Sequence, residues 1–172
     1  RFVFARVFLV MLILATPLLA DEVGLVRVGE NWRYFKGAAE PSPLPGAWQQ
    51  VAFDDASWFV GRSGFSAGFG TFVEATQLPD MLFSYTSVYF RGNFVVRDPA
   101  QIKWLVLRID YSGGFVAYLN GREIARRNLD GSTGSPVPHG VVATSSRPRG
   151  QPEEIDVSAF RAALNTGTNI LA

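Results

Sequence analysis

Residues 87–126 carry the most regular alternation of apolar and polar side chains in the chain. In residues 105–111 a large apolar or aromatic side chain occupies every second position, and residues 88–96 follow the same period of two. The alternating set is Leu105, Leu107, Ile109 and Tyr111 against Trp104, Val106, Arg108 and Asp110. A period of two places successive side chains on opposite faces of a strand, so it is typical of half-buried β-strands. This region therefore predicts consecutive antiparallel strands.

Asn120 and Gly121 separate two β-prone runs, residues 115–119 and 122–126. Both residues tolerate the positive φ that the central positions of a type I′ turn require, so the pair predicts a two-residue hairpin. Such a turn fixes the register, and the expected pairs are Leu119 with Arg122, Ala117 with Ile124, and Phe115 with Arg126. One face of this hairpin is the more apolar and should point to the core; it carries Phe115, Ala117, Leu119 and Ile124.

The rest of the chain predicts short strands joined by long loops. We expect strands over residues 25–28, 32–35, 153–157 and 169–171, and a short helix over residues 159–164 that Ser158 caps. Residues 40–46 and 128–152 are rich in proline or glycine and predict loops. Between residues 53 and 58, Asp54 or Asp55 should cap a turn while Trp58 enters the core. The sequence ends within the last strand, so we expect a truncated domain with an unpaired edge at residues 170–171.

The first 20 residues have the order of a secretory signal peptide. Arg1 and Arg6 precede an apolar run over residues 7–14, and the small residue Ala20 ends the segment. The run is too short to span a bilayer, and a membrane anchor is the alternative interpretation. We therefore expect cleavage after Ala20, a secreted or cell-surface location, and a mature domain over residues 21–172 that makes no membrane contact.

The charge balance and the lack of cysteine narrow the class of partner. Without Arg1 and Arg6 the 16 basic residues become 14 against 15 acids, so the formal net charge changes from +1 to −1. A nearly neutral domain lacks the electrostatic footprint that nucleic acid or acidic lipid requires. The chain contains no cysteine, so a secreted domain of this kind depends on its core, which favours a bacterial module.

Few side chains offer catalytic or metal-binding chemistry. Residues 64–68 match the Gly-x-Ser-x-Gly elbow of serine hydrolases, with Ser66 as the nucleophile, and His139 follows later in the chain. That motif requires a strand before the serine and a helix after it in a parallel sheet, whereas the residues after Ser66 argue against a helix. His139 is the single histidine, and no cysteine is present to complete a zinc site with it. We expect no catalytic residue, no metal site and no cofactor.

The order of the segments resembles the galactose-binding-domain-like jelly roll. The segments are S-V-Y-F-R-G-N-F, W-L-V-L-R-I-D-Y, F-V-A-Y-L-N-G-R-E-I-A-R, E-I-D-V-S-A-F-R-A-A-L and G-T-N-I-L-A. They are similar to the N-terminal sugar-binding domains of β-galactosidase-type glycoside hydrolases. They are also similar to accessory modules of large secreted bacterial proteins that contain a W…FDDSSW-like segment, here residues 53–58. The resemblance implies an all-β fold, an antiparallel β-sandwich with one or two short helices.

This resemblance implies a binding module, and the residues suggest where it binds. Sugar sites combine an aromatic platform with a few placed polar groups, a mixture found on the side of the strands away from the expected core. The candidate ligand-binding residues are Trp104, Arg108, Asp110, Tyr111 and Arg91. We therefore predict a non-catalytic carbohydrate-binding or surface-attachment module of a secreted multidomain bacterial protein. Its expected partners are a glycan or cell-surface polysaccharide and the neighbouring domains of the same chain.

Two alternatives remain open at this point. One is a purely structural spacer or docking domain beside a catalytic domain, which binds no ligand itself. The other is a serine hydrolase that uses Ser66. Related modules often carry acidic residues after the glycine-rich segment, where this chain has Gly70 and Thr71, so a metal site is not carried over from the resemblance.

Overall fold

A computed structural model of the chain describes residues 23–67 and 76–172. The expected signal peptide over residues 1–20 lies outside the described residues. Six strands form the main sheet, in the spatial order β2-β1-β5-β10-β7-β8, and every pair in it is antiparallel. The strands are β1 (Asn31–Lys36), β2 (Phe59–Arg62), β5 (Val88–Val96), β7 (Phe115–Leu119), β8 (Arg122–Arg127) and β10 (Gly167–Leu171).

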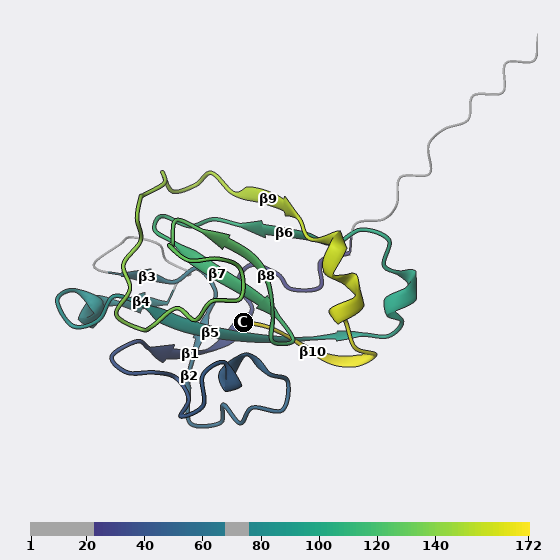
Figure 1. The fold of residues 1–172 in the computed structure, drawn as a ribbon, viewed down its shortest axis with the longest axis horizontal. Coiled ribbons are helices and arrows are strands. Elements are labelled where there is room, and N and C mark those ends of the chain that lie inside the picture. The colour runs from purple at the N-terminus through teal and green to yellow at the C-terminus, as the bar shows by residue number, and fades with distance from the viewer. Residues whose placement is uncertain (1–22, 68–75) are drawn as a thin grey trace, which may run out of the picture.

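A second, smaller sheet covers one face of the main sheet. β6 (Val106–Ile109) pairs antiparallel with β9 (Glu153–Asp156), and Figure 1 shows this pair beside β7 and β8. Leu107 and Ile155 of the small sheet pack against the buried core between the layers. That core consists of Phe94, Val96, Ala117, Leu119, Ile124, Ala125, Val157 and Leu164. The alternation predicted for residues 104–111 is thus confirmed, with Leu107 and Ile109 inward and Val106 and Arg108 outward.

The remaining elements are short. β3 (Ser66–Ala67) and β4 (Gln77–Leu78) form a parallel pair. In the described ranges there are four 3-10 helices: η1 (Ala47–Gln49), η2 (Pro79–Met81), η3 (Pro99–Gln101) and η4 (Ser158–Ala163). Strands in antiparallel sheets dominate, which confirms the all-β class. Helix η4 matches the expected helix, but the expected cap at Ser158 is wrong: Ser158 is the first residue of η4, and its Oγ accepts from the Leu105 N–H at 2.9 Å.

The other face of the main sheet is also covered in part. Four rings, from Trp48, Trp58, Tyr89 and Tyr118, form a second buried group, the aromatic cluster. Trp48 lies edge-on to Tyr89 and to Tyr118, with ring centroids 4.9 and 5.7 Å apart. Trp48 and Trp58 come from the segment between β1 and β2, so Trp58 enters the core as predicted. β7 is consequently buried on both faces, with Leu119 on one side and Tyr118 on the other.

The hairpin between β7 and β8 confirms the predicted turn and changes part of the predicted register. Asn120 and Gly121 have φ of 51° and 86°, and Leu119 pairs with Arg122 as expected. The other two expected pairs are wrong, because the register shifts between Ala117 and Tyr118. The observed pairs are Ala117 with Ala125 and Phe115 with Arg127. The extra residue in β8 is Ile124, and this β-bulge lets two consecutive residues, Ile124 and Ala125, enter the same core.

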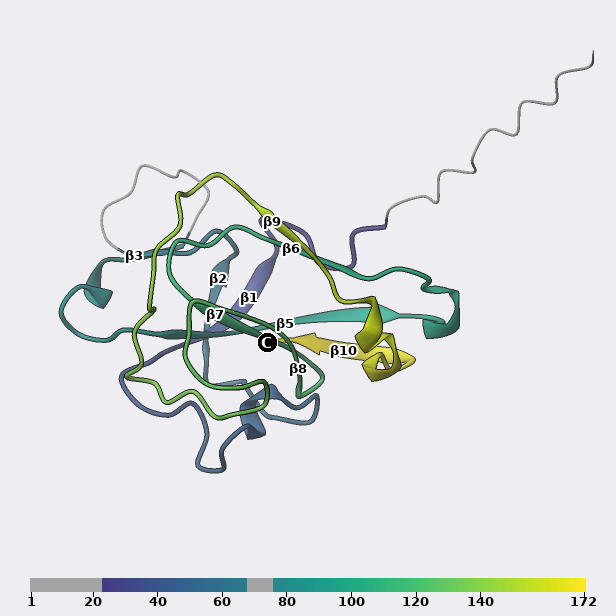
Figure 2. The ribbon, with the colours of Figure 1, turned by 45° about the horizontal axis from the view of Figure 1, so that its top comes forward.

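Two further expectations are corrected by the sheet topology. Residues 25–28 form bends and turns instead of a strand, while Leu25 and Val26 still pack against the core. β10 is a central strand between β5 and β7 (Figure 2), so the expected unpaired edge at residues 170–171 is wrong. Even Ala172 is paired, since it exchanges two backbone hydrogen bonds with Tyr118 at 2.8 and 2.9 Å.

Asn169 joins β10 to the hairpin turn. Its side chain is completely buried. Its Oδ1 accepts from Asn120 Nδ2 and from the Asn165 N–H, both at 2.7 Å, and its Nδ2 donates to the carbonyls of Asn165 and Gly167. Asn120 Oδ1 in turn accepts from the Ile170 N–H at 2.8 Å. The two amides therefore fix the turn, β10 and the end of η4 relative to one another.

Replacement of Asn169 by alanine should destabilise the fold. Asn169→Ala leaves several buried backbone and side-chain groups without partners, so we expect a loss of about 2–4 kcal/mol in the free energy of unfolding. Urea denaturation followed by tryptophan fluorescence measures this loss. Asn165→Ala is the matched control, because only backbone atoms of Asn165 take part in these bonds, and it should change the value by less than about 0.5 kcal/mol. Equal effects of the two substitutions would contradict this account.

Candidate functional site

The outward surface of β6 and β9 carries the most exposed tryptophan. Trp104, just before β6, is 73% exposed, and Val106 is 55% exposed. Val106 pairs with Asp156 and Arg108 with Glu154, so these side chains share the outer face. Arg108 Nε lies 3.7 Å from Glu154 Oε1 in a solvent-exposed ion pair. We call this surface the Trp104 face; it consists of Trp104, Val106, Arg108, Glu154 and Asp156.

Asp110 and Tyr111, two other candidate residues, hold the long loop that follows β8. Asp110 Oδ2 accepts from the Gly150 N–H at 2.8 Å, and the Tyr111 hydroxyl donates to Glu153 Oε2 at 2.6 Å. The guanidinium of Arg147 lies 5.4 Å from the centre of the Tyr111 ring. Both side chains are therefore engaged by the protein. They lie next to the Trp104 face along the chain and position the loop at its end.

Glu153 is the centre of this small polar network. Its Oε1 accepts from Arg127 Nε at 2.9 Å while its other oxygen accepts from Tyr111. The hydrogen bond from Tyr111, followed by the one from Arg127, lowers the pKa of Glu153 below its ordinary value. The same bond raises the pKa of Tyr111, because an ionised phenol could not donate to the carboxylate.

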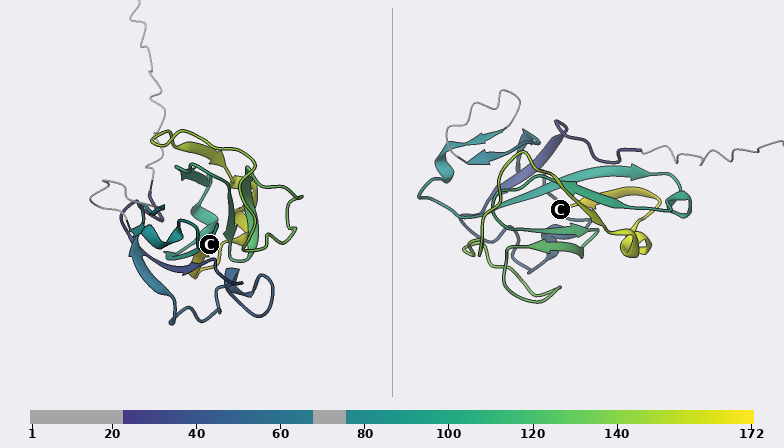
Figure 3. Two further views of the ribbon diagram at one scale, coloured as in Figure 1. Left: turned by 90° about the vertical axis from the view of Figure 1, so that its left-hand side faces the viewer. Right: turned by 90° about the horizontal axis from the view of Figure 1, so that it is seen from above.

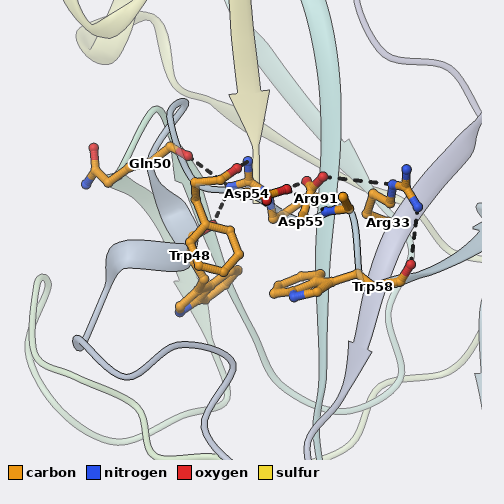
Figure 4. A network of polar contacts seen from close by, with 9 residues as sticks. Arg33, Trp48, Gln50, Asp54, Asp55, Trp58 and Arg91 are labelled. Atoms are coloured by element: carbon orange, nitrogen blue, oxygen red, sulfur yellow. Dashed lines mark hydrogen bonds and ion pairs between the residues drawn. The ribbon is translucent and has the colours of Figure 1, made fainter.

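Arg91 lies apart from the other candidates, on the opposite face of the main sheet. It is only 3% exposed, and its Nε donates to Asp55 Oδ2 at 2.6 Å. Its two terminal nitrogens donate to three backbone carbonyls, those of Trp48, Gln50 (3.0 Å) and Phe53 (3.4 Å). Figure 4 shows this network and the neighbouring Arg33. Arg91 thus fastens the segment between β1 and β2 onto β5.

Asp54 and Asp55, which the sequence treats as a pair, have separate roles. Asp54 Oδ1 accepts from the Ala56 N–H at 3.0 Å, which confirms that one acid caps the local turn. Asp55 instead pairs with Arg91 and lies 3.8 Å from Arg33 Nε. The sequence gives no direct signal for this contact, since Asp55 and Arg91 are far apart in the chain.

A polar hollow of about 310 Å³ opens beside Asp55, where the aromatic cluster stops. We call it the Arg33 hollow; its lining includes Asn31, Arg33, Asp55, Arg91, Asn93 and Ile170. Sequence reasoning missed this site as a whole. The signal was present as polar residues at alternate positions in two strands, Asn31 and Arg33 in β1 and Arg91 and Asn93 in β5. Only the pairing of β1 with β5 shows that they share one face.

The proposed nucleophile elbow is not assembled in the described residues. Ser66 lies in β3, and its buried Oγ has no hydrogen-bond partner there. His139 is held elsewhere, with Nδ1 at 2.9 Å from Glu40 Oε1 and its carbonyl accepting from Thr86 and Ser87. The hydrogen bond from the His139 side chain is the main cause of a lowered pKa of Glu40. Residues 68–75, where the elbow requires a helix, lie outside the described residues.

Residues 23–67 and 76–172 contain no cluster of three or more histidine, cysteine, aspartate or glutamate side chains that could hold a metal ion. Within the same ranges no helix has the length and apolar character needed to cross a membrane.

Loss of the buried guanidinium should destabilise the fold strongly. Arg91→Met removes the ion pair and the bonds to three carbonyls, and it leaves Asp55 with the more distant Arg33. Because Asp55 is partly exposed, we expect a loss of about 2–4 kcal/mol, somewhat below the value for a fully buried pair. Arg108→Met is the matched control at an exposed ion pair and should cost less than about 1 kcal/mol. Chemical denaturation of both variants measures the difference, and a small effect at Arg91 would contradict its structural role.

The network around Glu153 predicts a pH dependence of stability. The folded pKa of Glu153 is lowered, so its contribution is complete above the ordinary value near 4.5 and is lost as the pH falls through the lower folded value. Glu153→Gln should therefore reduce the urea midpoint at pH 7, and the difference from the parent protein should shrink below pH 4.5. Glu154→Gln, at the exposed neighbouring position, should change the midpoint little at any pH. A difference in urea midpoint that grows as the pH falls would contradict this account.

The comparisons with known proteins find a structural likeness and no family. No protein-family model matches this chain, and no curated relative does either. A β-glucuronidase from an uncultured Clostridium species is similar over 84% of this chain, with 20% identity and a TM-score of 0.45. A calcium-binding mutant of Bacteroides uniformis β-glucuronidase 2 is similar over 84% of this chain, with 16% identity and a TM-score of 0.49. A glycosyl hydrolase family 2 member from Bacteroides cellulosilyticus is similar over 83% of this chain, with 14% identity and a TM-score of 0.44. The chain spans 20%, 14% and 16% of the length of these three chains.

Proposed function

We propose that this chain is a non-catalytic carbohydrate-binding or surface-attachment module. In this proposal the sandwich is a galactose-binding-like jelly roll that belongs to a secreted, multidomain bacterial protein. Its partners are a glycan or cell-surface polysaccharide and the neighbouring domains of the same chain. The observation that carries the proposal is the exposure of Trp104, which is 73% accessible on the outer face of β6 and β9.

An exposed indole beside charged groups suits a sugar polymer. The apolar face of a pyranose ring packs on an aromatic ring, while nearby polar groups bond to its hydroxyls. On the Trp104 face, Val106 extends the apolar surface, and Arg108 and Glu154 supply a donor and an acceptor. Because this surface is the outside of a sheet, it offers an extended contact along a chain more than an enclosed pocket for one ring.

The five candidate residues have different roles in this proposal. Trp104 and Arg108 are exposed and available to a ligand. Asp110 and Tyr111 act in this proposal by positioning the loop around Gly150 and Glu153 at the end of the face. Arg91 is buried on the other face of the main sheet, so it is not part of the Trp104 face.

In residues 23–67 and 76–172 no base is hydrogen-bonded to Ser66, which supports the non-catalytic proposal. A serine nucleophile requires a hydrogen-bonded base that a third group orients, and His139 is bound to Glu40 instead. Treatment with a fluorophosphonate probe distinguishes the hydrolase alternative. We expect no covalent labelling, and labelling that disappears in Ser66→Ala would replace the binding module by an enzyme.

Substitution of Trp104 should weaken polysaccharide binding. A glycan array and a pull-down with insoluble polysaccharides, with calcium and with chelator, identify a ligand for the parent protein. Trp104→Ala should weaken its affinity at least about fivefold, since stacking on an aromatic ring accounts for about 1 kcal/mol. Phe83→Ala is the matched control, because Phe83 is another fully exposed aromatic side chain on a different loop, and it should leave binding unchanged.

The other outcomes are equally informative. Saturable binding that survives in Trp104→Ala retains the function but places the site elsewhere. Failure to bind any glycan favours the structural alternative, a spacer or docking domain beside a catalytic domain. Neither Trp104 nor Phe83 is buried, so both variants should unfold at the same temperature as the parent protein. A loss of binding without a change in this temperature then reflects the lost surface contact.

A further inference from the structure

We propose that the Arg33 hollow is a second binding site and that it takes the carboxylate group of an acidic sugar residue. The inference rests on the proposed carbohydrate-binding function, but it concerns the opposite face of the main sheet from Trp104. It depends on three observations: the position of the hollow, the unused hydrogen-bond donors around it and its net charge.

The hollow lies where the cover of the main sheet ends. Arg33 of β1 pairs directly with Val60 of β2 and with Arg91 of β5, so their side chains share one face. Asn93 of β5 pairs with Ile170 of β10 on the same face, two positions further along. Asp55 lies between the guanidinium groups of Arg91 and Arg33, and Figure 4 shows the rings of Trp48 and Trp58 beside this network.

The two ends of the hollow differ in burial. Arg91 and Ile170 at its base are 3% and 5% exposed. Asn31 and Asn93 are exposed at the rim, and the side chain of Arg33 is 39% exposed. A space of about 310 Å³ with a buried base and a polar rim is close to the lower limit of ordinary small-ligand sites. It has room for a single sugar unit.

The free groups around the hollow are mainly donors. Arg33 uses one terminal nitrogen to donate to the Trp58 carbonyl at 3.2 Å, and its Nε lies 3.8 Å from Asp55. Its second terminal nitrogen makes no hydrogen bond with the described residues. The side-chain amides of Asn31 and Asn93 are also without a hydrogen-bond partner in that part of the chain. Asp55 directs one carboxylate oxygen to Arg91 and the other towards Arg33, so the one strong acceptor is already occupied.

The charge of the lining favours an anion. Arg33 and Arg91 carry two positive charges against the single negative charge of Asp55, which gives a local net charge of +1. A carboxylate presents two acceptor oxygens that match the planar fork of a guanidinium, and the amides of Asn31 and Asn93 donate to the ring hydroxyls next to it. A neutral sugar would supply hydroxyls but would leave the extra charge uncompensated.

Asn93 offers the sharpest test, because its side chain supports no other part of the described fold. Isothermal titration calorimetry would compare a tetramer of galacturonic acid with its fully methyl-esterified form, which has the same hydroxyls without the charges. We expect the acid to bind at least tenfold more tightly than the ester. Asn93→Asp should weaken binding of the acid at least tenfold through charge repulsion, and Asn93→Ala should weaken it less than fivefold. Asn165→Asp, away from the hollow, should leave it unchanged.

A second pair of variants separates this site from the Trp104 face. Trp104→Ala should leave the affinity for the acidic tetramer unchanged, so the two sites can fail independently. Arg33→Gln should lower this affinity while thermal unfolding reports any loss of the bond to Trp58. Equal affinity for acid and ester, equal effects of Asn93→Asp and Asn93→Ala, or no binding of the acid would each overturn the proposal. Tighter binding of an oligoaspartate peptide than of the tetramer would also overturn it and would identify a docking site for acidic protein segments.

Discussion

The arrangement of the molecule depends on the burial of one guanidinium in the middle of the main sheet. Arg91 occupies a position in β5 at which an apolar side chain would continue the aromatic cluster, and burial of its charge without partners would be very costly. The cost is offset by the carboxylate of Asp55 and by the carbonyls of Trp48, Gln50 and Phe53. These acceptors all come from the segment between β1 and β2. The guanidinium therefore requires that segment to lie on the sheet, and the segment brings Trp48 and Trp58 with it.

This constraint divides one face of the sheet into two regions with different properties. On one side of Arg91 the rings of the aromatic cluster are buried, and on the other side the Arg33 hollow is open and polar. The opposite face is covered in part by β6 and β9, whose Leu107 and Ile155 pack against the core, and Figure 3 gives two further views of the sheets. β10 lies inside the main sheet, between β5 and β7. The side chain of Asn169 connects β10 to the hairpin turn through Asn120. β10 thus joins the two parts of the main sheet.

The features that local patterns determine could be predicted from the sequence. The Asn120–Gly121 turn, the alternation in residues 104–111 and the entry of Trp58 into the core all follow from the residue type and its close neighbours. The bulge at Ile124 could not be predicted, since a period-two pattern in β7 gives no information about an extra residue in its partner. The role of Arg91 was missed for a related reason: its acceptors are mostly backbone carbonyls, which leave no mark in the amino-acid sequence.

The candidate binding residues show what separates a structural polar group from an available one. Arg91, Asp110 and Tyr111 have the residue types expected in a sugar site, yet each already has its hydrogen bonds made by the protein. Trp104, Arg33 and Asn93 are set apart by surface area or donors that remain free. Alternation along a strand identifies the face on which a side chain lies. Whether a ligand can bind that side chain depends on how many of its hydrogen bonds the folded protein already makes. By that criterion the two faces offer different chemistry, an exposed indole on one and a positively charged hollow on the other.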